Sequence, residues 1–400
     1  TAMIMLIGVV GKPSTGKSTF FKAVTLAEVE IANYPFTTIK PNHAVGYIKI
    51  DCVDKEFETQ CNPRIGYCIK HNRFVPIDLL DVAGLVPGAH EGAGMGSQFL
   101  DDLNQANALI HVIDISGSTN EKGEPVDAGT YDPANDIRFL EEELDQWYLR
   151  ILKKGWDKFI RTVKATGGEP EKAIAKQMSG LRVTEDIAKE SIKRLELPSD
   201  IETWSEEKIK SLASELRKST KPMIIAANKA DVGIGKNNYE RLKKEFPNYS
   251  IIPCSAESEL ALKEAAKHDL IEYIPGEKDF IMKGELNQKQ KKALTFIEQN
   301  VLARFGDTGV QKVVDTVVFD ILKMIAIFPG GVNKLADKNG KILPDCFLLK
   351  DGSTALDFAF SLHTDIGKGF IRAIDVKTKR TVGKDHLLKN RDVVEIITRA

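Results

Sequence analysis

The sequence predicts an α/β fold built on a doubly wound, mostly parallel sheet. Short, continuous apolar runs recur along the chain, and several lead directly into loops rich in glycine or polar residues. Such runs are typical of strands buried on both faces, and the loops then lie where doubly wound sheets bind ligands. We expect the strands at residues 3–10, 45–50, 74–80, 108–115, 221–227 and 249–253.

Length and composition set broad limits on the function. The 400 residues are enough for two or three domains, and the formal net charge is −1. Any nucleic-acid binding must therefore come from a local patch of charge. No apolar run reaches membrane-spanning length and nothing resembles a secretory signal, so we expect a cytoplasmic protein without a membrane partner.

The first apolar run leads into a glycine-rich loop and then into a helix expected at residues 18–25. Gly11 and Gly16 allow the backbone to wrap so that its N–H groups point at a β-phosphate, and the helix N-terminus adds a positive dipole. Lys17 would bridge the β- and γ-phosphates, and the Ser18 hydroxyl would bind Mg²⁺. The residues expected at the phosphates are Gly11, Lys12, Pro13, Ser14, Thr15, Gly16, Lys17, Ser18 and Thr19.

Two further segments would respond to the γ-phosphate. Thr38, in the loop of residues 33–42, would add a second hydroxyl to Mg²⁺, and Thr37 is the weaker choice. Asp81 follows an apolar run and would hold Mg²⁺ through a water, while the N–H of Gly84 would meet the γ-phosphate. The expected metal-binding residues are Ser18, Thr38 and Asp81, and the expected catalytic residues are Lys17, Thr38 and Gly84.

The motif Asn228-Lys229-Ala-Asp231 follows another apolar run and would select the base. The Asp231 carboxylate can accept from guanine N1–H and from the exocyclic amine, whereas adenine would leave this carboxylate unpaired. Lys229 would pack its stem over the base, and Ser255 and Ala256 would offer a backbone N–H to guanine O6. The ordered set of motifs predicts a guanine-nucleotide switch that binds GTP and GDP with Mg²⁺ as its cofactor.

Longer motifs resemble the Obg-like GTPases. They are Tyr34-Pro-Phe-Thr-Thr38 and the glycine-rich run from Asp81 to Gly96, and the chain is most similar to the YchF/Ola branch in an archaeal-looking form. The stretches 352–359, 363–373 and 392–397 resemble a TGS domain. The resemblance implies a P-loop NTPase G domain with an inserted helical hairpin and a C-terminal β-grasp (TGS) domain. It also implies a slow GTPase whose partner is the ribosome, an RNA or another translation component.

The expected parts of the chain are the G domain at 1–118 and 220–280, an inserted helical domain at 119–219, a helical connector at 281–316 and the TGS domain at 317–400. Asn287 can cap a connector helix that runs to about residue 305. Residues 317–327 are apolar and β-branched and are expected to open the C-terminal sheet, and a helix is expected at 355–364.

Three departures from related proteins bear on the chemistry. Many YchF-type members lack a good Asn-Lys-x-Asp motif and are associated with ATP, whereas this chain keeps that motif, which favours GTP. Leu85 stands where Ras-like proteins have a water-positioning glutamine, so isolated turnover should be slow. Ser14 stands where potassium-activated relatives carry asparagine, so replacing sodium by potassium should matter little.

A basic stripe is predicted on a helix expected between residues 133 and 164. At 100° per residue its cations fall within an arc of roughly 140°, and apolar side chains occupy the other side. The cations are Arg150, Lys153, Lys154, Lys158, Arg161 and Lys164. Such a stripe would suit the phosphate backbone of RNA, and the alternative is a solvated charged face.

Other functions stay open at this stage. The chain could be a nucleotide-dependent regulatory protein that binds ATP as well as GTP and senses a ligand with its TGS domain. A small-molecule kinase would need an acceptor pocket and an arginine-bearing lid. The Asp-x-x-Gly and Asn-Lys-x-Asp motifs argue against a kinase.

The five cysteines favour free thiols, because their number is odd and no signal peptide is evident. Cys52, Cys61 and Cys68 lie close enough in the sequence to suggest zinc. Their spacing is not C-x₂-C, however, and His71 is the only nearby candidate for a fourth ligand.

Overall fold

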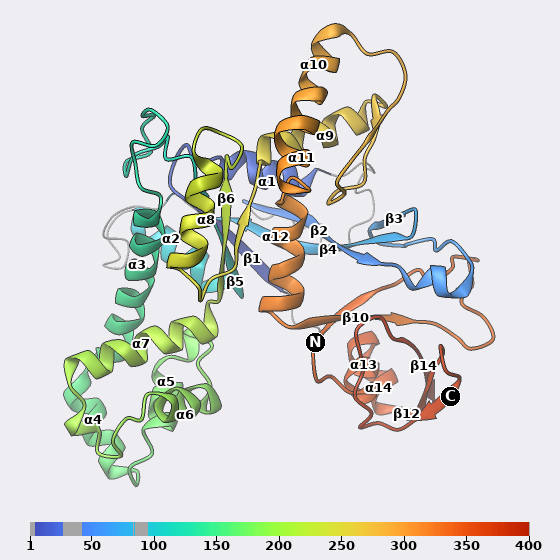
Figure 1. Cartoon of the computed structure of the whole chain (residues 1–400). Helices are drawn as coiled ribbons and strands as arrows, with labels where there is room; N and C mark the ends of the chain where they lie inside the picture. The colour runs from blue at the N-terminus through green and yellow to red at the C-terminus, as the bar shows by residue number, and fades with distance from the viewer. Residues whose placement is uncertain (1–4, 27–41, 83, 85–94, 400) are drawn as a thin grey trace. The chain divides into compact units, whose positions relative to one another are not determined.

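The computed structural model describes residues 5–26, 42–82, 84 and 95–399 (Figure 1). The chain divides into two compact units. The first unit consists chiefly of Lys22–Leu79 and Glu257–Ala400, and the second consists of Leu6–Phe21 and Leu80–Ala256. All described residues expected to bind the nucleotide belong to the second unit.

Parallel strands form the centre of the second unit, in the order β1-β5-β6-β7. They are β1 (Leu6–Val10), β5 (Ala108–Asp114), β6 (Met223–Asn228) and β7 (Ile251–Pro253). Every residue of β1, β5 and β6 is buried, which is why these strands read as continuous apolar runs. The sheet confirms the predicted α/β class and brings the carboxyl ends of its strands to one edge.

Helices fill the chain between β5 and β6, where the sequence predicts a helical insertion (Figure 1). They are α3 (Ala134–Lys153), α4 (Trp156–Ala165), α5 (Pro170–Gln177), α6 (Glu185–Arg194) and α7 (Glu206–Thr220). The remaining helices of this unit are α2 (Met95–Gln105), α8 (Gly235–Glu245) and the first residues of α1 (Lys17–Thr25). Helices α3 and α7 pack together through a buried ion pair, in which Nε of Arg217 lies 2.8 Å from Oδ1 of Asp145.

The helix that the sequence predicts from residue 133 to 164 is interrupted. Helix α3 ends at Lys153, and α4 begins at Trp156 after Gly155, whose φ is +63°. The side-chain amide of Gln177 donates to two carbonyl oxygens at the end of α3, at 2.8 and 2.9 Å. The prediction of one helix was wrong. The glycine in a left-handed conformation and the hydrogen bonds from Gln177 to the last carbonyl groups end α3, although the helical periodicity of the sequence continues past this point.

Strands β2 (His43–Asp51), β3 (Tyr67–Ile69) and β4 (Asn72–Asp81) belong to the first unit, except for the last two residues of β4. Strand β4 lies between β2 and β3, and it pairs with β3 in antiparallel register. The rings of Tyr67 and Phe74 stack with their centroids 4.5 Å apart, and Tyr47 packs against Tyr67. This aromatic cluster holds the β3–β4 hairpin against β2.

The chain that follows the sheet is mainly helical. It contains α9 (Ala256–Lys267), β8 (Ile271–Glu272), β9 (Ile281–Met282), α10 (Gln288–Ile297), α11 (Ala303–Phe305) and α12 (Val310–Thr316). Asn287 caps α10 as predicted, and it forms a reciprocal capping box with Gln290. The helical path continues beyond α10 to Phe305 and ends at Gly306, whose φ is +89°.

The prediction that residues 317–327 open the C-terminal sheet was wrong in its first half. Helix α12 continues as a wider helical turn from Val317 to Ile321, and strand β10 begins only at Met324. The buried residues Val313, Val314, Val317 and Val318 recur at helical spacing and pack one face of this helix. Their β-branched side chains favour strands, but burial of that face outweighs the weak local preference.

The C-terminal sheet has five strands in the order β11-β10-β14-β12-β13. They are β10 (Met324–Pro329), β11 (Phe347–Lys350), β12 (Phe370–Asp375), β13 (Arg380–Val382) and β14 (Val393–Thr398), and they accompany α13 (Ala355–Leu362) and α14 (Thr364–Lys368). Phe358 of α13 belongs to the same buried apolar cluster as Ile327 and Val394 of the sheet. In the described part of the chain, no helix has both the length and the apolar character that a membrane span requires.

Candidate nucleotide site

The glycine-rich loop connects β1 to α1, and two of its glycines lie where no side chain fits. Gly16 has a φ of +90°, and a Cβ at this position would lie 2.1 Å from Nδ2 of Asn228. A Cβ on Gly11 would lie 2.7 Å from the carbonyl oxygen of Val112. The loop therefore approaches β5 and the base motif more closely than a residue with a side chain would allow.

Lys12 is the loop residue whose side chain differs most from its expected role. Its ammonium group lies 2.7 Å from Oδ2 of Asp136, donates to the carbonyl oxygen of Thr119 at 3.0 Å and lies over the ring of Tyr131. The residue is only 6 % exposed. Its side chain thus fixes the loop to the start of α3, and only its backbone remains for a phosphate.

Lys17 and Asp81 form an ion pair at the start of α1. Nζ of Lys17 lies 2.8 Å from Oδ1 of Asp81 and donates to the carbonyl oxygen of Val82 at 2.6 Å. Val82 in turn donates to the carbonyl oxygen of Val9, which places the end of β4 beside β1. The exposed Ser18 hydroxyl and the Asp81 carboxylate are the oxygen donors that Mg²⁺ prefers, so these residues fit the predicted cofactor.

The base motif is bonded directly to the phosphate loop. Nδ2 of Asn228 donates to the carbonyl oxygen of Thr15 at 2.9 Å, and its Oδ1 accepts from the N–H of Ala256, also at 2.9 Å. The asparagine thereby joins the loop, β6 and the start of α9. The N–H of Ala256, which the sequence assigns to guanine O6, has Asn228 as its acceptor. Asp231 is half-buried, and Ser255 is buried beside Ala256.

Asp114, which was not among the residues predicted from the sequence, is the buried centre of this network. It ends β5, is 1 % exposed and accepts hydrogen bonds from three hydroxyl groups of residues 116–119. Nζ of Lys229 lies 3.3 Å from Oδ2 of Asp114 and donates to the carbonyl oxygen of Ser14 at 2.9 Å. Burial would raise the pKa of Asp114, but the hydroxyl groups and Lys229 lower it, so the carboxylate stays charged.

A carboxylate at the carboxyl end of a buried parallel strand is a signal that could have pointed to Asp114. Lys229 therefore has a second role besides packing over a base. Its ammonium group links the base motif to the phosphate loop, while its aliphatic stem can still cover a base. Among the other expected residues, Pro13 and Gly84 are exposed, Thr15 is buried and Thr19 is half-buried. Thr38 lies outside the described residues, as does Leu85.

The six cations of the predicted basic stripe are divided between α3, α4 and the turn that joins them. Nζ of Lys153 lies 2.5 Å from a carboxylate oxygen of Glu206, and Nζ of Lys164 lies 2.7 Å from one of Glu202. The other four are exposed, and no acidic side chain among the described residues forms an ion pair with them. They are Arg150, Lys154, Lys158 and Arg161.

Comparison with known proteins decides the family. Residues 6–154 match a model described as 50S ribosome-binding GTPase, residues 226–331 match the G4 motif-containing domain of YGR210-like Obg-like GTPases, and residues 335–398 match the TGS domain. A GTP-binding protein of Methanocaldococcus jannaschii is 48 % identical over 396 residues, and the match covers 99 % of each chain. The chain belongs to the Obg-like GTPase family.

Two further comparisons place this Obg-like GTPase among its relatives. The crystal structure of a GTP binding protein from Pyrococcus horikoshii OT3 is 42 % identical with a TM-score of 0.77, covering 99 % of this chain and 100 % of that one. The ribosome-binding ATPase YchF of Mycoplasma genitalium is 29 % identical over 407 residues, covering 96 % of this chain and 97 % of that protein. The matches confirm the predicted G domain and the C-terminal TGS domain.

Proposed function

We propose that this Obg-like GTPase binds GTP and GDP and hydrolyses GTP slowly, as a cytoplasmic switch that acts with the ribosome or another translation component. The observation that carries the proposal is the set of bonds from Asn228 and Lys229 to Thr15, Ser14 and Asp114. These bonds connect the phosphate loop directly to the base motif. Binding of the base to the motif is therefore coupled to binding of the phosphates to the loop.

The described residues supply positioning and charge for phosphoryl transfer. In the reaction, water attacks the γ-phosphorus and the bond to the oxygen bridging the β- and γ-phosphates breaks. Lys17 would move its charge from Asp81 to the β- and γ-phosphates, and the N–H groups of the loop and of Gly84 would stabilise the developing negative charge. Bound Mg²⁺ would neutralise phosphate charge, and Ser18 and Asp81, with Thr38, are the residues proposed to hold it.

The partner is proposed from the names of related proteins. One matching family model is described as a ribosome-binding GTPase, and the Mycoplasma relative is described as ribosome-binding. A switch of this kind would report its nucleotide state to that partner through the segments that contact the γ-phosphate. The slow turnover follows from Leu85, because a leucine cannot orient the attacking water.

A second candidate is a regulatory protein that binds ATP as well as GTP. The Mycoplasma relative is described as an ATPase, and the Ala256 N–H, which the sequence assigns to guanine O6, donates to Asn228. Asp231 then becomes the deciding residue, because its carboxylate can pair with the two donors of guanine and with neither position of adenine.

Replacing Asp231 by asparagine tests the choice of base. We expect Asp231→Asn to lose GTP affinity and to gain affinity for xanthosine triphosphate, because the new amide can donate to the 2-oxo group of xanthine. Both nucleotides, together with ATP, would be titrated against the wild-type protein and the variant. Asp231→Ala is the matched control and should lose GTP without gaining the xanthine nucleotide. Unchanged GTP affinity in Asp231→Asn, or a wild-type preference for ATP, would contradict the proposal.

A further inference from the structure

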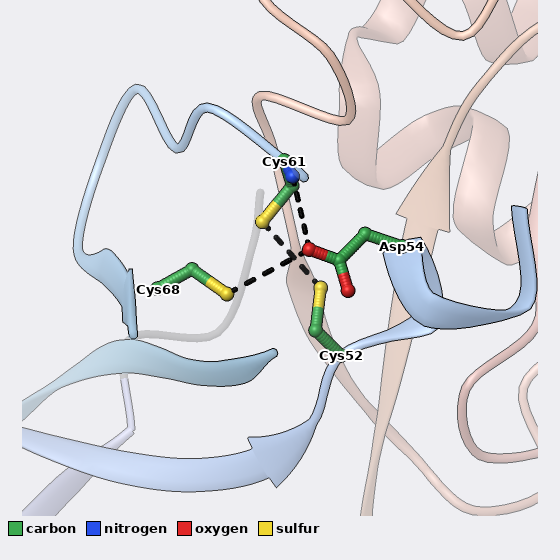
Figure 2. Close-up of side chains that lie close together, drawn as sticks. All are labelled: Cys52, Asp54, Cys61 and Cys68. Atoms are coloured by element: carbon green, nitrogen blue, oxygen red, sulfur yellow. Dashed lines mark hydrogen bonds between the residues drawn. The ribbon is translucent and has the colours of Figure 1, made fainter. Parts of the chain in front are cut away.

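Three cysteines and one buried carboxylate converge beside the end of β2 (Figure 2). Cys52 directly follows β2, Asp54 lies in the short helix Val53–Phe57, Cys61 lies in the loop after it and Cys68 lies in β3. One possible ligand atom from each residue, three sulfurs and a carboxylate oxygen, lies within 4.8 Å of all the others. The four residues belong to the first unit and are separate from the nucleotide site.

The distances match ligands around a single metal ion. The sulfurs of Cys52 and Cys61 are 3.5 Å apart, and the sulfur of Cys68 lies 3.9 Å from Oδ2 of Asp54. A disulfide would need about 2.05 Å between its sulfurs. A tetrahedral zinc ion with bonds of about 2.3 Å places two sulfurs about 3.8 Å apart. A polynuclear iron–sulfur cluster puts its own atoms between the thiolates and would hold them farther apart.

The burial of Asp54 calls for a positive charge nearby. Asp54 is 0 % exposed, Cys52 is 1 % exposed and Cys61 is 3 % exposed. Oδ1 of Asp54 lies 2.9 Å from Nδ1 of His71, and Oδ2 accepts from the N–H of Cys61 at 2.9 Å and faces the sulfur of Cys68. His71 thus holds the carboxylate so that Oδ2 points toward the sulfurs. A dication among these groups would compensate the buried negative charge.

We propose that Cys52, Asp54, Cys61 and Cys68 bind one Zn²⁺ ion in a closed tetrahedral site. Thiolates favour zinc over harder cations such as Mg²⁺, and four protein ligands leave no open position, which is the arrangement of structural sites. His71 was the fourth ligand considered from the sequence, and in the structure it instead orients Asp54. Asp54 does not stand out in the sequence, because an aspartate two residues from a cysteine is not part of a common zinc spacing.

The position of the site indicates what the ion would stabilise. The loop that carries Cys61 continues to Asn62 and Arg64, whose N–H groups donate to the carbonyl oxygens of Ile342 and Pro344, both at 2.8 Å. The Arg64 side chain also pairs with Asp337 at 3.0 Å. A metal bound between this loop, β2 and β3 would hold in place the surface to which the C-terminal segment is hydrogen-bonded, so metal binding would add to folding stability.

Cobalt provides a direct test on the full-length chain. The reduced protein would be stripped of metal with a chelator and titrated with Co²⁺ alone. We expect the intense visible absorption of tetrahedral, thiolate-bound cobalt, saturating at about one equivalent per chain and removed by Zn²⁺. Cys61→Ala, Cys68→Ala and Asp54→Asn should lose this absorption. Cys254→Ser changes a buried cysteine of the other unit and should retain it.

His71→Ala tests whether His71 orients Asp54 or binds the metal itself. We expect cobalt affinity to fall about tenfold to a hundredfold, with the same spectrum, because the carboxylate remains but is no longer held by the imidazole. Zn²⁺ should raise the unfolding temperature of the wild-type protein and of Cys254→Ser but not of Cys68→Ala. This readout does not depend on GTP hydrolysis, so it fails or succeeds independently of the proposed function.

Three results would overturn the proposal. One is the absence of the cobalt spectrum in reduced wild-type protein that is folded by circular dichroism. Another is equal cobalt binding by the wild type and the three ligand variants, which would show adventitious binding. The third is a Cys52–Cys61 disulfide, found by peptide mass spectrometry in protein prepared without reductant, in a chain that binds no zinc after reduction.

Discussion

Gly16 joins the two halves of the nucleotide site through the absence of a side chain. Its φ is +90°, and a Cβ would lie 2.1 Å from Nδ2 of Asn228. We expect Gly16→Ala to displace Asn228 from Thr15, to lower GTP affinity at least about tenfold and to cost roughly 1–3 kcal/mol of folding stability. Nucleotide titration and urea unfolding measure the two effects.

Gly180→Ala is the matched control for this change. Gly180 does not have a positive φ, and a Cβ there would meet no atom within 4 Å. Its GTP affinity and unfolding free energy should both stay close to the wild-type values. If Gly16→Ala bound GTP as tightly as Gly180→Ala, the close approach of the loop to Asn228 would not matter for binding.

Lys221 has a buried amine whose effect on stability depends on pH. The residue is 0 % exposed, and its amine donates to the carbonyl oxygen of Ala106 at 2.8 Å, which also accepts from Arg182 at 3.2 Å. Burial, with Arg182 adding to it, lowers the pKa of Lys221 from 10.5 to about 7. Between these values the unfolded chain binds the extra proton, so folding stability should rise with pH, by up to about 1.4 kcal/mol per unit.

Lys221→Met removes this titration and still leaves Ala106 its bond from Arg182. We expect the variant to be more stable than the wild type at about pH 6 and to lose that advantage toward about pH 10. Urea unfolding across this range measures the difference. The exposed Lys189→Met is the control and should keep the wild-type slope. A wild-type slope in Lys221→Met would show that another group causes the pH dependence.

At the scale of the elements, the sequence predicts best where local chemistry and burial agree. The strands β1, β5 and β6 are apolar throughout and buried throughout, and the Asn287 cap of α10 has its glutamine partner three residues later. Val317, Val318 and Ile321 are β-branched but helical, because the burial pattern of this segment follows a helix. There, tertiary packing outweighs the local preference that the prediction used.

In the candidate site, the sequence likewise predicts where residues lie better than it predicts which residues they contact. The motifs indicate which residues gather at the carboxyl ends of the strands, since the loop and the base motif each follow a buried run. They do not indicate that Lys12 forms an ion pair with Asp136, or that Lys229 forms one with Asp114. These partners come from segments far apart in the sequence, and only the folded chain brings them together.

At the scale of the whole molecule, the chain combines the proposed nucleotide switch with four exposed cations that we propose as contacts for a polyanionic partner. Lys153 and Lys164 have acidic partners, which leaves Arg150, Lys154, Lys158 and Arg161 as the candidates for binding phosphates. Because α3 ends before Gly155, these four do not form the single helical stripe of the sequence prediction. Their contribution to binding must be measured together.

Replacing these four cations by glutamate should abolish binding to ribosomal subunits or RNA while GTP affinity stays unchanged, because none of the four lies in the nucleotide site. Single alanine changes should each weaken binding modestly and lower the salt slope by about one unit for each phosphate that the protein no longer neutralises. Co-sedimentation with ribosomal subunits, with GTP or GDP bound, measures the effect.

A matched variant replaces four exposed lysines of α6 and α8 by glutamate, namely Lys189, Lys193, Lys243 and Lys244. Equal losses of binding in the two variants would reflect net charge alone, whereas an unchanged salt slope in the first would make its cations a solvated face and direct the search to the C-terminal domain.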